Sequence, residues 1–326
     1  MFKMTKRTLR LISNPNAGRG GRSRALEVAR FCALMKVHGV ETEVAHTSGP
    51  GDATRLAAQA AREGVREVVV SGGDGTINEV LQGLVGTQVR LGIWPVGTAN
   101  VLARELRLPF APESVAASVA RGEARRVSVG CAVKEATGER RYFFLMAGVG
   151  LDASVVHRVR PRLKRRVGEG AYWYAGFAHL TNWPPPVFTL EANGHNFPAT
   201  FAVIGKAARY GGGLGITPRA RIDHPEFEIC IINSHSRLRY IQLLLHAMRP
   251  GGVADNLAGV HYLRATRARA IGDAPVQVDG ELIGHLPMTF EIAHEQIEII
   301  APRAGEAGAE GRGRRQRAGA GAGSSD

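Results

Sequence analysis

The segment Val68-Val69-Val70-Ser71-Gly72-Gly73-Asp74-Gly75-Thr76-Ile77-Asn78-Glu79-Val80 joins a β-branched run to a helical pattern through a glycine-rich turn. β-branched residues favour a strand, and the glycines end it. Thr76 and Glu79 have the spacing of a capping box, so the helix is expected to begin at Thr76. The segment therefore predicts a strand, a tight loop and a helix that places Ile77, Val80, Leu81 and Leu84 on one face.

The turn within this segment has the features of a phosphate-binding loop. Glycines let the main chain approach a ligand closely, and the first N–H groups of a helix have no partner inside the helix. These groups point outward at the positive end of the helix dipole, which favours a phosphate. Asp74 adds a carboxylate suited to a magnesium ion or to orienting a hydroxyl. An ordinary capped turn is the weaker alternative, because positions 72–76 hold three glycines, an acid and a threonine.

The chain has 326 residues, of which 44% are hydrophobic, and this is enough for two domains with sizeable cores. Its formal net charge of +13 favours an anionic partner, which is a nucleic acid, a membrane surface or a phosphorylated ligand. The three cysteines are far apart, so neither a disulfide framework nor a zinc site is indicated, and a cytoplasmic location fits. The sequence predicts no signal peptide and no bilayer-spanning stretch, so any membrane contact is expected to be peripheral.

Up to about residue 126 the chain alternates between strands and helices. This alternation predicts an α/β domain, residues 1–126, with a parallel sheet and helices on both faces. Ligands of such sheets bind beyond the carboxyl ends of the strands, so the loops that follow these strands are expected to meet at one edge. The predicted strands are 9–13, 40–46, 68–71 and 89–94, and the predicted helices are 23–37, 52–64, one that begins at Thr76 and one that follows Asn100.

Each of these loops carries small polar residues that suit a nucleotide. Taken alone, Asn14-Pro15-Asn16 fits an ordinary turn, and Asp52 is sufficiently explained as a helix cap. Asn100 fits either the start of a helix or a ligand contact. The prediction of a binding site therefore depends on the convergence of the loops. The candidate residues are Asn14, Thr47, Ser71, Gly72, Gly73, Asp74, Gly75, Thr76, Gly97, Thr98 and Asn100.

From about residue 127 the pattern changes to short strands separated by turns such as Asn193-Gly194 and Asp279-Gly280. This pattern predicts a second, predominantly antiparallel β domain at residues 127–302. Its predicted strands are 127–133, 141–146, 187–191, 197–205, 227–232, 259–270, 276–278 and 289–292.

Four further segments complete the second half of the chain. Helices are expected near 168–180 and 238–248, and a strand predicted at 296–300 fits either domain. Residues 303–326 are rich in Gly, Ala and Arg and have no apolar periodicity, which predicts a disordered tail.

A basic run at 158–166 is followed by aromatic residues between Tyr172 and Trp183. Cationic and aromatic side chains together suit an anionic bilayer surface. A solvated basic face with aromatic residues in the core explains the same composition, and both interpretations stay open. RNA binding is a further alternative, but no RRM or KH signature is present, so no nucleic-acid partner is expected. The oligomeric state also stays open, with a dimer among the alternatives.

The short motif Val278-Asp279-Gly280-Glu281 has two interpretations. Asp-Gly is a strong signal for a two-residue hairpin turn, and the residues alone favour this interpretation. The functional alternative makes Glu281 a general base beside a substrate hydroxyl.

Taken together, these motifs resemble the diacylglycerol kinase catalytic family in its bacterial lipid-kinase branch, to which sphingosine and ceramide kinases are related. The motifs occur in the family's order and span roughly residues 7–300. The Gly-Gly-Asp-Gly-Thr core alone is less specific, because NAD kinases and phosphofructokinases carry similar loops. The matching motifs are Asn14-Pro15 with Gly18, Thr47 ahead of Gly51-Asp52-Ala53, Gly72-Gly73-Asp74-Gly75-Thr76, Pro95-x-Gly97-Thr98-x-Asn100, Gly148-x-Gly150-x-Asp152-Ala153 and Asp279-Gly280-Glu281.

The resemblance implies an NAD-kinase-like α/β domain and a C-terminal antiparallel β-sandwich, with ATP and Mg²⁺ bound in a cleft between them. By the same analogy Glu281 accepts the proton of a lipid hydroxyl, and Asp74 is a second catalytic residue and a candidate magnesium ligand. The attacking oxygen then takes the γ-phosphate in line. The nucleotide contacts implied by the resemblance are Asn14, Thr47, Gly72 to Thr76 and Thr98.

Three positions depart from the family's pattern. Val101 follows Asn100 where the family often has Asp, and Ser128 stands where bacterial diacylglycerol kinases carry an Asp. The segment Asp223-His224-Pro225-Glu226-Phe227 replaces an Asp-Asp-Gly-Leu-type segment that holds a structural magnesium. Asp223 is thereby left as the candidate ligand, with His at the next expected ligand position.

These observations predict an ATP-dependent lipid kinase that acts at the inner membrane face on diacylglycerol or a related glycerolipid or sphingoid lipid. A kinase of a soluble polyol or nucleotide is one alternative, because the glycine-rich core is shared with such enzymes. A catalytically inactive regulator that binds ATP or lipid is another, because Ser128 and Val101 depart from the pattern.

Overall fold

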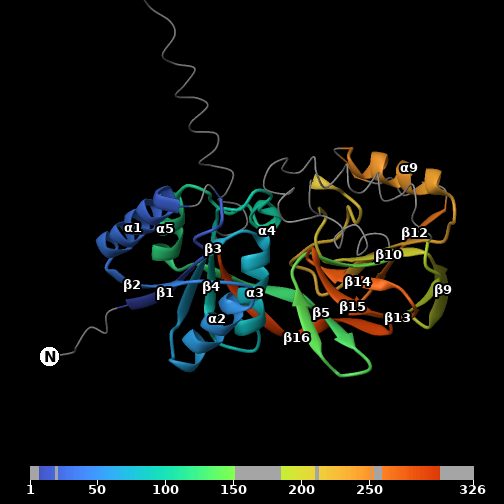
Figure 1. Cartoon of the computed structure of the whole chain (residues 1–326), viewed down its shortest axis with the longest axis horizontal. Helices are drawn as coiled ribbons and strands as arrows, with labels where there is room; N and C mark the ends of the chain where they lie inside the picture. The colour runs from blue at the N-terminus through green and yellow to red at the C-terminus, as the bar shows by residue number, and fades with distance from the viewer. Residues whose placement is uncertain are drawn as a thin grey trace, which may run out of the picture.

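The computed structural model describes residues 7–18, 21–150, 185–209, 213–249, 251–252 and 259–301. It has two lobes that lie side by side (Figure 1). The helix predicted at 168–180, the basic run at 158–166 with the aromatic residues after it, Asp152 and the tail predicted at 303–326 lie outside the described residues.

The first lobe contains a parallel sheet with helices on both faces, as predicted. Its strands run in the order β2-β1-β3-β4. The central strand β3 is buried along its whole length because its two faces enter different cores. Val68 and Val70 pack toward α2 and α3, whereas Val69 packs toward α1 and α5. The elements are β1 (Arg7–Ser13), α1 (Gly21–Val37), β2 (Val40–His46), α2 (Asp52–Arg62), β3 (Glu67–Gly72), α3 (Asp74–Leu84), β4 (Arg90–Pro95), α4 (Val101–Glu105) and α5 (Pro112–Arg121).

The start of α3 differs from the prediction. The helix begins at Asp74 instead of Thr76, and Gly73 occupies the N-cap position with no side-chain cap. Glu79 does not reach back to its own helix; its Oε2 accepts a hydrogen bond from the main-chain N–H of Ala53 at 3.2 Å. Glu79 therefore connects α3 to α2 and does not cap its own helix.

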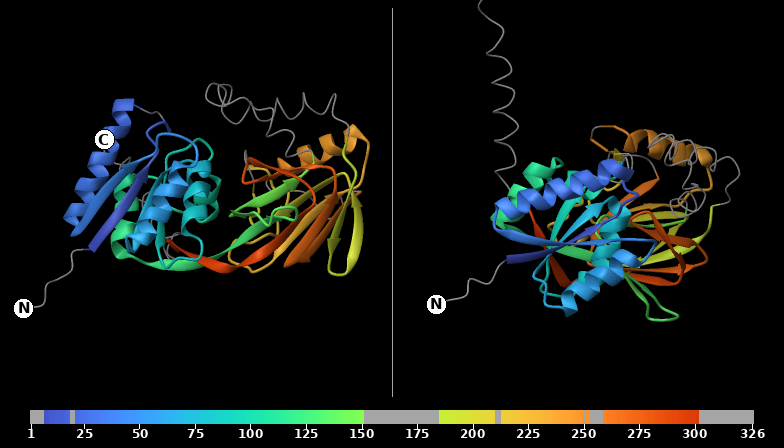
Figure 2. Two further views of the ribbon diagram at one scale, coloured as in Figure 1. Left: turned by 60° about the horizontal axis from the view of Figure 1, so that its bottom comes forward. Right: turned by 60° about the vertical axis from the view of Figure 1, so that its left-hand side comes forward.

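A long antiparallel pair, β5 (Ala124–Lys134) and β16 (Met288–Ile300), connects the two lobes (Figure 2). β16 pairs with β13 at one end and runs parallel to β4 at the other, where Ile299 lies opposite Leu91. The strand predicted at 296–300 therefore returns to the first lobe. It forms one strand with the segment predicted at 289–292, although the pairing register with β5 shifts between Ile292 and Gln296.

The second lobe is a sandwich of two sheets with α9 on its outer side, which confirms the predicted β domain class. One layer consists of β5, β6, β16, β13, β8 and β9, which belong to the same ten-stranded sheet as the parallel strands of the first lobe. The other layer is a six-stranded sheet in the order β12-β11-β10-β7-β14-β15. The remaining elements are β6 (Arg140–Phe143), β7 (Met146–Val149), β8 (Phe188–Ala192), β9 (His195–Ala199), β10 (Phe201–Gly205), β11 (Phe227–Ile232), α9 (Arg237–Ala247), β12 (Val260–Ala265), β13 (Arg267–Gly272), β14 (Pro275–Val278) and β15 (Glu281–His285).

Three strands predicted as continuous are divided between the two sheets. The segments 141–146, 197–205 and 259–270 break into β6 and β7, β9 and β10, and β12 and β13. Each break lets the chain cross from one layer of the sandwich to the other. At the first crossing the apolar pattern runs on through Phe144 and Leu145, whereas the other two crossings lie at the single residues Thr200 and Thr266.

Candidate active site

The loops after the parallel strands meet at the carboxyl edge of the sheet, as predicted. The ladder continues one residue beyond the strands: the N–H of Asn14 donates to the carbonyl of Ser71 at 2.9 Å. The N–H of Thr47 donates to the carbonyl of Ser13 at 3.0 Å. Main-chain hydrogen bonds therefore hold three of the predicted nucleotide loops together.

These loops enclose a pocket of about 230 Å³. Inside it, Asn14 Nδ2 donates to Thr76 Oγ1 at 3.1 Å, which connects the first loop to α3. Asn14 Oδ1 accepts the N–H of Asn16 at 2.9 Å and fixes the turn. The pocket is lined by Asn14, Asn16, Thr47, Ser48, Gly49, Pro50, Thr76 and Glu79.

Glycine is required in two of the loops because neighbouring main chain or a neighbouring side chain lies too close for a Cβ atom. A Cβ atom on Gly97 would lie 2.5 Å from the Cα of Gly73, and one on Gly72 would lie 2.5 Å from the Cβ of Thr76. The side chain of Asn100 closes its own loop: it accepts from the N–H of Gly97 at 2.8 Å and donates to the carbonyl of the same residue at 2.7 Å. This use of the amide favours the structural alternative for Asn100.

Thr98 and Gly75 differ from these glycines, since both are exposed. A Cβ on Gly75 would meet no atom within 4 Å. The two residues therefore lie open at the edge where a ligand is expected.

Asp74 has a contact that the sequence did not reveal. Its carboxylate accepts from the N–H groups of Val101 at 3.1 Å and Leu102 at 3.3 Å, which are the first groups of α4. A carboxylate suits such a helix N-terminus because the N–H groups there lack partners within the helix. Asp74 thus fixes the Gly97–Asn100 loop while its remaining lone pairs can accept from a ligand.

A buried cation lies behind the glycine-rich turn. Arg24 is 4% exposed, donates to the hydroxyl of Ser71, and pairs with Glu27 at 2.8 Å. Its guanidinium lies 4.3 Å from the ring centroid of Trp94. Sequence reasoning missed Arg24, because one arginine in a helix with many polar residues gives no local signal.

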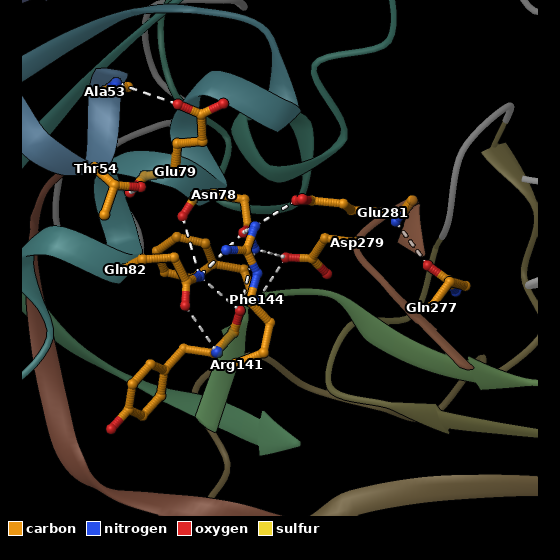
Figure 3. A network of polar contacts seen from close by, with 12 residues as sticks. Ala53, Thr54, Asn78, Glu79, Gln82, Arg141, Phe144, Gln277, Asp279 and Glu281 are labelled. Atoms are coloured by element: carbon orange, nitrogen blue, oxygen red, sulfur yellow. Dashed lines mark hydrogen bonds and ion pairs between the residues drawn. The ribbon is translucent and has the colours of Figure 1, made fainter. Parts of the chain in front are cut away.

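The Asp279-Gly280 turn connects β14 and β15 as the predicted hairpin, with φ angles of 45° and 86°. Asp279 is at the same time the centre of a polar network (Figure 3). Its carboxylate accepts from the N–H groups of Phe144, Leu145 and Met146 at 2.8, 2.9 and 3.1 Å. Burial raises the pKa of Asp279, and these donors oppose the shift because they favour the carboxylate.

Asn78 connects this network to the first lobe. It lies on α3, the helix that carries the glycine-rich turn at its N-terminus, and its Nδ2 donates to Asp279 at 2.9 Å and to the carbonyl of Tyr142 at 3.2 Å (Figure 3). Gln82, one turn further along α3, holds the same main chain: it donates to the carbonyl of Tyr142 at 2.9 Å and accepts its N–H at 3.0 Å.

Glu281 is exposed and forms an ion pair with Arg141. The same guanidinium donates to Asn78 Oδ1 at 3.3 Å. The predicted proton acceptor is thereby connected through Arg141 and Asn78 to the helix that begins at the glycine-rich turn. Sequence reasoning did not identify Arg141, Asn78 or Gln82, because their roles arise only when the two lobes meet.

The residues around Asp223 do not fit a structural magnesium. The carboxylate of Asp223 pairs with Arg221 at 3.1 Å, and this contact lowers its pKa. Among the described residues, no group of three or more His, Cys, Asp or Glu side chains is placed to hold a metal ion. In the same ranges no helix is both long and apolar enough to cross a bilayer.

Comparison with known proteins gives two adjacent matches. Residues 8–132 match the diacylglycerol kinase catalytic domain, and residues 146–301 match the YegS C-terminal NAD kinase beta sandwich-like domain. A diacylglycerol kinase of Bacillus subtilis is 30% identical over 301 residues, which is 90% of this chain and 96% of the relative. A probable lipid kinase YegS-like of Chromohalobacter salexigens is 30% identical over 267 residues, 79% and 83% of the two chains. A crystal structure of a diacylglycerol kinase from Bacillus anthracis has the same fold, with a TM-score of 0.69 at 20% identity over 91% of this chain and 97% of that one.

Proposed function

The chain belongs to the diacylglycerol kinase catalytic domain family, a family of lipid kinases, and from this premise we propose that it transfers the γ-phosphate of ATP to a hydroxyl of a membrane lipid. The proposed acceptor is diacylglycerol or a related glycerolipid or sphingoid lipid. Residues 1–126 are the proposed nucleotide domain and residues 127–302 the proposed lipid domain.

The observation that carries this proposal is the double role of α3. The N-terminus of α3 carries the glycine-rich turn beside the pocket of Asn14 and Thr47. One turn later, Asn78 contacts Asp279 and the guanidinium that pairs with Glu281. A phosphate on the turn and a hydroxyl near Glu281 would therefore be positioned by one rigid helix.

Each residue then has a stated chemical task. The free N–H groups at the start of α3 bind phosphate oxygens, and the polar pocket of Asn14, Thr47 and Thr76 binds the rest of the nucleotide. Mg²⁺ bound together with ATP would neutralise the charge of the phosphates. Glu281 accepts the proton of the lipid hydroxyl, for which its ion pair with Arg141 must open toward the substrate.

The outer face of α9 supports peripheral contact with an anionic membrane. Leu238, Leu245 and Met248 are 69%, 52% and 54% exposed on this helix and its last turn. The exposed Arg237 and Arg249 flank them, which gives the mixture of apolar and basic side chains that anionic bilayers attract. This face of α9 is the proposed contact with the inner membrane face.

The proposal is tested with radiolabelled ATP, Mg²⁺ and vesicles that contain diacylglycerol, phosphatidylglycerol, ceramide or sphingosine. Label in an organic-extractable product is expected, and Glu281→Gln should reduce its rate roughly 100-fold or more. Glu139→Gln is the matched control, because Glu139 and Glu281 are both 59% exposed and both in an ion pair.

Two outcomes would contradict parts of the proposal. Equal rates for the two variants would remove Glu281 from the proton-accepting role. Label that enters only a soluble polyol or nucleotide would replace the lipid kinase with the soluble-substrate alternative.

A further inference from the structure

Lys206 is a lysine with no exposed surface. It directly follows the buried strand β10, and its ammonium donates to three main-chain carbonyls: that of Ile222 at 2.9 Å, that of Arg221 at 3.3 Å and that of His224. An ammonium has three N–H groups, so these carbonyls satisfy all of them. Burying a charge is costly unless its hydrogen-bonding groups have partners, and here the three carbonyls are those partners.

The carbonyl of His224 has a second donor from the strand that connects the lobes. Ser128 on β5 donates its hydroxyl to this carbonyl at 3.1 Å. The hydroxyl of Thr217, at the other end of the same segment, donates to the carbonyl of Ala207 at 2.9 Å. Residues 217–224 are therefore fastened both to the segment after β10 and to β5.

The same lysine reaches the polar network of the candidate active site through its main chain. The N–H of Lys206 donates to the carbonyl of Leu145 at 2.7 Å, and the N–H of Leu145 donates to Asp279 at 2.9 Å. The main chain of Lys206, whose ammonium holds the carbonyls of 221–224, therefore lies two hydrogen bonds from the Asp279 carboxylate.

A cluster of main-chain carbonyls is also what a hard divalent cation selects, together with carboxylates. Here the carboxylate of Asp223 pairs with Arg221, and a hydroxyl of Ser128 stands beside the cluster. Burial lowers the pKa of Lys206 to about 8, and the charges of Asp223 and Glu226 oppose this shift. The geometry itself identifies the group as an ammonium, because the three carbonyl acceptors match the three N–H donors that only the charged form has.

We propose that the ammonium of Lys206 is a built-in cation that takes the place of a structural divalent metal ion between the 217–224 segment and β5. The folded chain then needs no metal ion of its own, and any magnesium requirement is confined to the nucleotide. This inference does not rest on the proposed function, because it concerns binding and stability without substrate.

The first test uses the full chain without nucleotide. The probe is Mn²⁺, whose binding is followed by electron paramagnetic resonance, and thermal unfolding is recorded in EDTA and in millimolar Mg²⁺. The melting temperature is expected to be the same in both within about 1 °C, since a ligand stabilises only what it binds. Stoichiometric Mn²⁺ binding at micromolar concentration, with a higher melting temperature in Mg²⁺, would overturn the proposal.

Two lysine variants separate this role from a general effect of charge. Lys206→Met leaves three buried carbonyls without their donor and should lower the melting temperature by roughly 5 °C or more. Lys134→Met is the control, because Lys134 lies on the same β domain but pairs with the exposed Glu139. Equal melting temperatures for the two variants would contradict the assignment.

A third variant is designed to let a metal ion bind where the ammonium of Lys206 now lies. Lys206→Ala with Ser128→Asp removes the ammonium and places a carboxylate next to the carbonyl of His224. This double variant is expected to bind Mn²⁺ and to gain melting temperature in Mg²⁺, which the wild type does not. A folded double variant that does neither would show that the lysine and a metal ion are not equivalent here.

Discussion

The glycine-rich loops of the first lobe and the Asp279 turn of the second lobe face the same candidate site, but different contacts hold them. In the loops, main chain packs on main chain, as where Gly97 meets Gly73. In the turn, one carboxylate gathers donors from residues 144–146 and from Asn78. From this difference we expect added side-chain volume in the loops to lower the stability of the protein, whereas at the turn the loss of the carboxylate charge should lower it.

Removing the charge of the turn should have the largest effect. Asp279→Ala leaves four donors without their acceptor, three of them main-chain N–H groups. We expect the free energy of unfolding to fall by about 3 kcal/mol or more, with loss of most kinase activity. Denaturant unfolding and the labelled-ATP assay measure the two quantities.

Asp273→Ala is the control for this variant, because the side chain of Asp273 is 94% exposed and its ion pair with His285 lies at the surface. It should change the free energy of unfolding by no more than about 0.5 kcal/mol. Two variants of equal stability would show that the Asp279 network contributes nothing.

Adding volume to the loops should have the second largest effect. Gly97→Ala places a methyl group 2.5 Å from the Cα of Gly73, so the two loops must separate. A loss of about 1–3 kcal/mol in stability is expected, together with weaker ATP binding by titration calorimetry. Gly75→Ala, where a Cβ meets no atom within 4 Å, should not lose stability. Similar stability losses at both positions would contradict the close-contact explanation.

The connection between the two regions is tested by a pair of variants on α3. Asn78→Ala and Gln82→Ala both remove contacts to Tyr142, but only Asn78 also contacts Asp279. Each should cost about 1 kcal/mol of stability. Only Asn78→Ala is expected to lower kcat, roughly tenfold, with little change in KM for ATP. Equal kcat values for the two variants would show that the link to Asp279 is structural alone.

The smallest effect concerns the loop after β2, which the carboxylate of Asp52 holds. Asp52 accepts from the N–H groups of Ser48 at 2.8 Å and Gly49 at 3.1 Å, and the Ser48 contacts lower the pKa of Asp52 below its usual 3.8. A lowered pKa in the folded state stabilises the protein above the unfolded value, and this contribution disappears as the pH falls through the folded value.

Wild type should therefore melt slightly higher than Asp52→Asn at pH 6, and the difference should shrink as the pH falls below 3.8. Melting curves between pH 7 and pH 3 measure it. A difference that does not change with pH would assign the effect of Asp52 to its shape instead of its charge.

The contrast between the loops of the first lobe and the Asp279 turn also explains how much of the structure the sequence could predict. Periodicity placed the parallel strands, and topology alone then brought Asn14, Thr47 and Thr76 to one pocket. The network around Asp279 could not be predicted in this way, because Asn78 and Asp279 are 201 positions apart. The crossing between β6 and β7 was missed because Phe144 and Leu145 continue the apolar pattern while their N–H groups turn toward Asp279.

Some local signals were nevertheless present. Lys206 directly follows five buried residues of β10, and a lysine at the end of such a run is itself unusual. Asn100 fits both a helix start and a ligand contact in the sequence, and in the structure its amide forms two hydrogen bonds to Gly97 within its own loop. Ser128 departs from the family's pattern, and its hydroxyl donates to the same carbonyl of His224 that accepts from the ammonium of Lys206. The sequence alone did not reveal this shared acceptor.

The route of β16 also sets an order of events on the ribosome. The first lobe receives its last strand only when Ile299 pairs with Leu91, after the whole second lobe has been synthesised. At about 5–20 residues per second, the nascent chain waits on the order of ten seconds with the edge of β4 unpaired. An open edge of this kind invites pairing with other chains. A fragment that stops before Ile297 is thus expected to aggregate, however complete its nucleotide loops are.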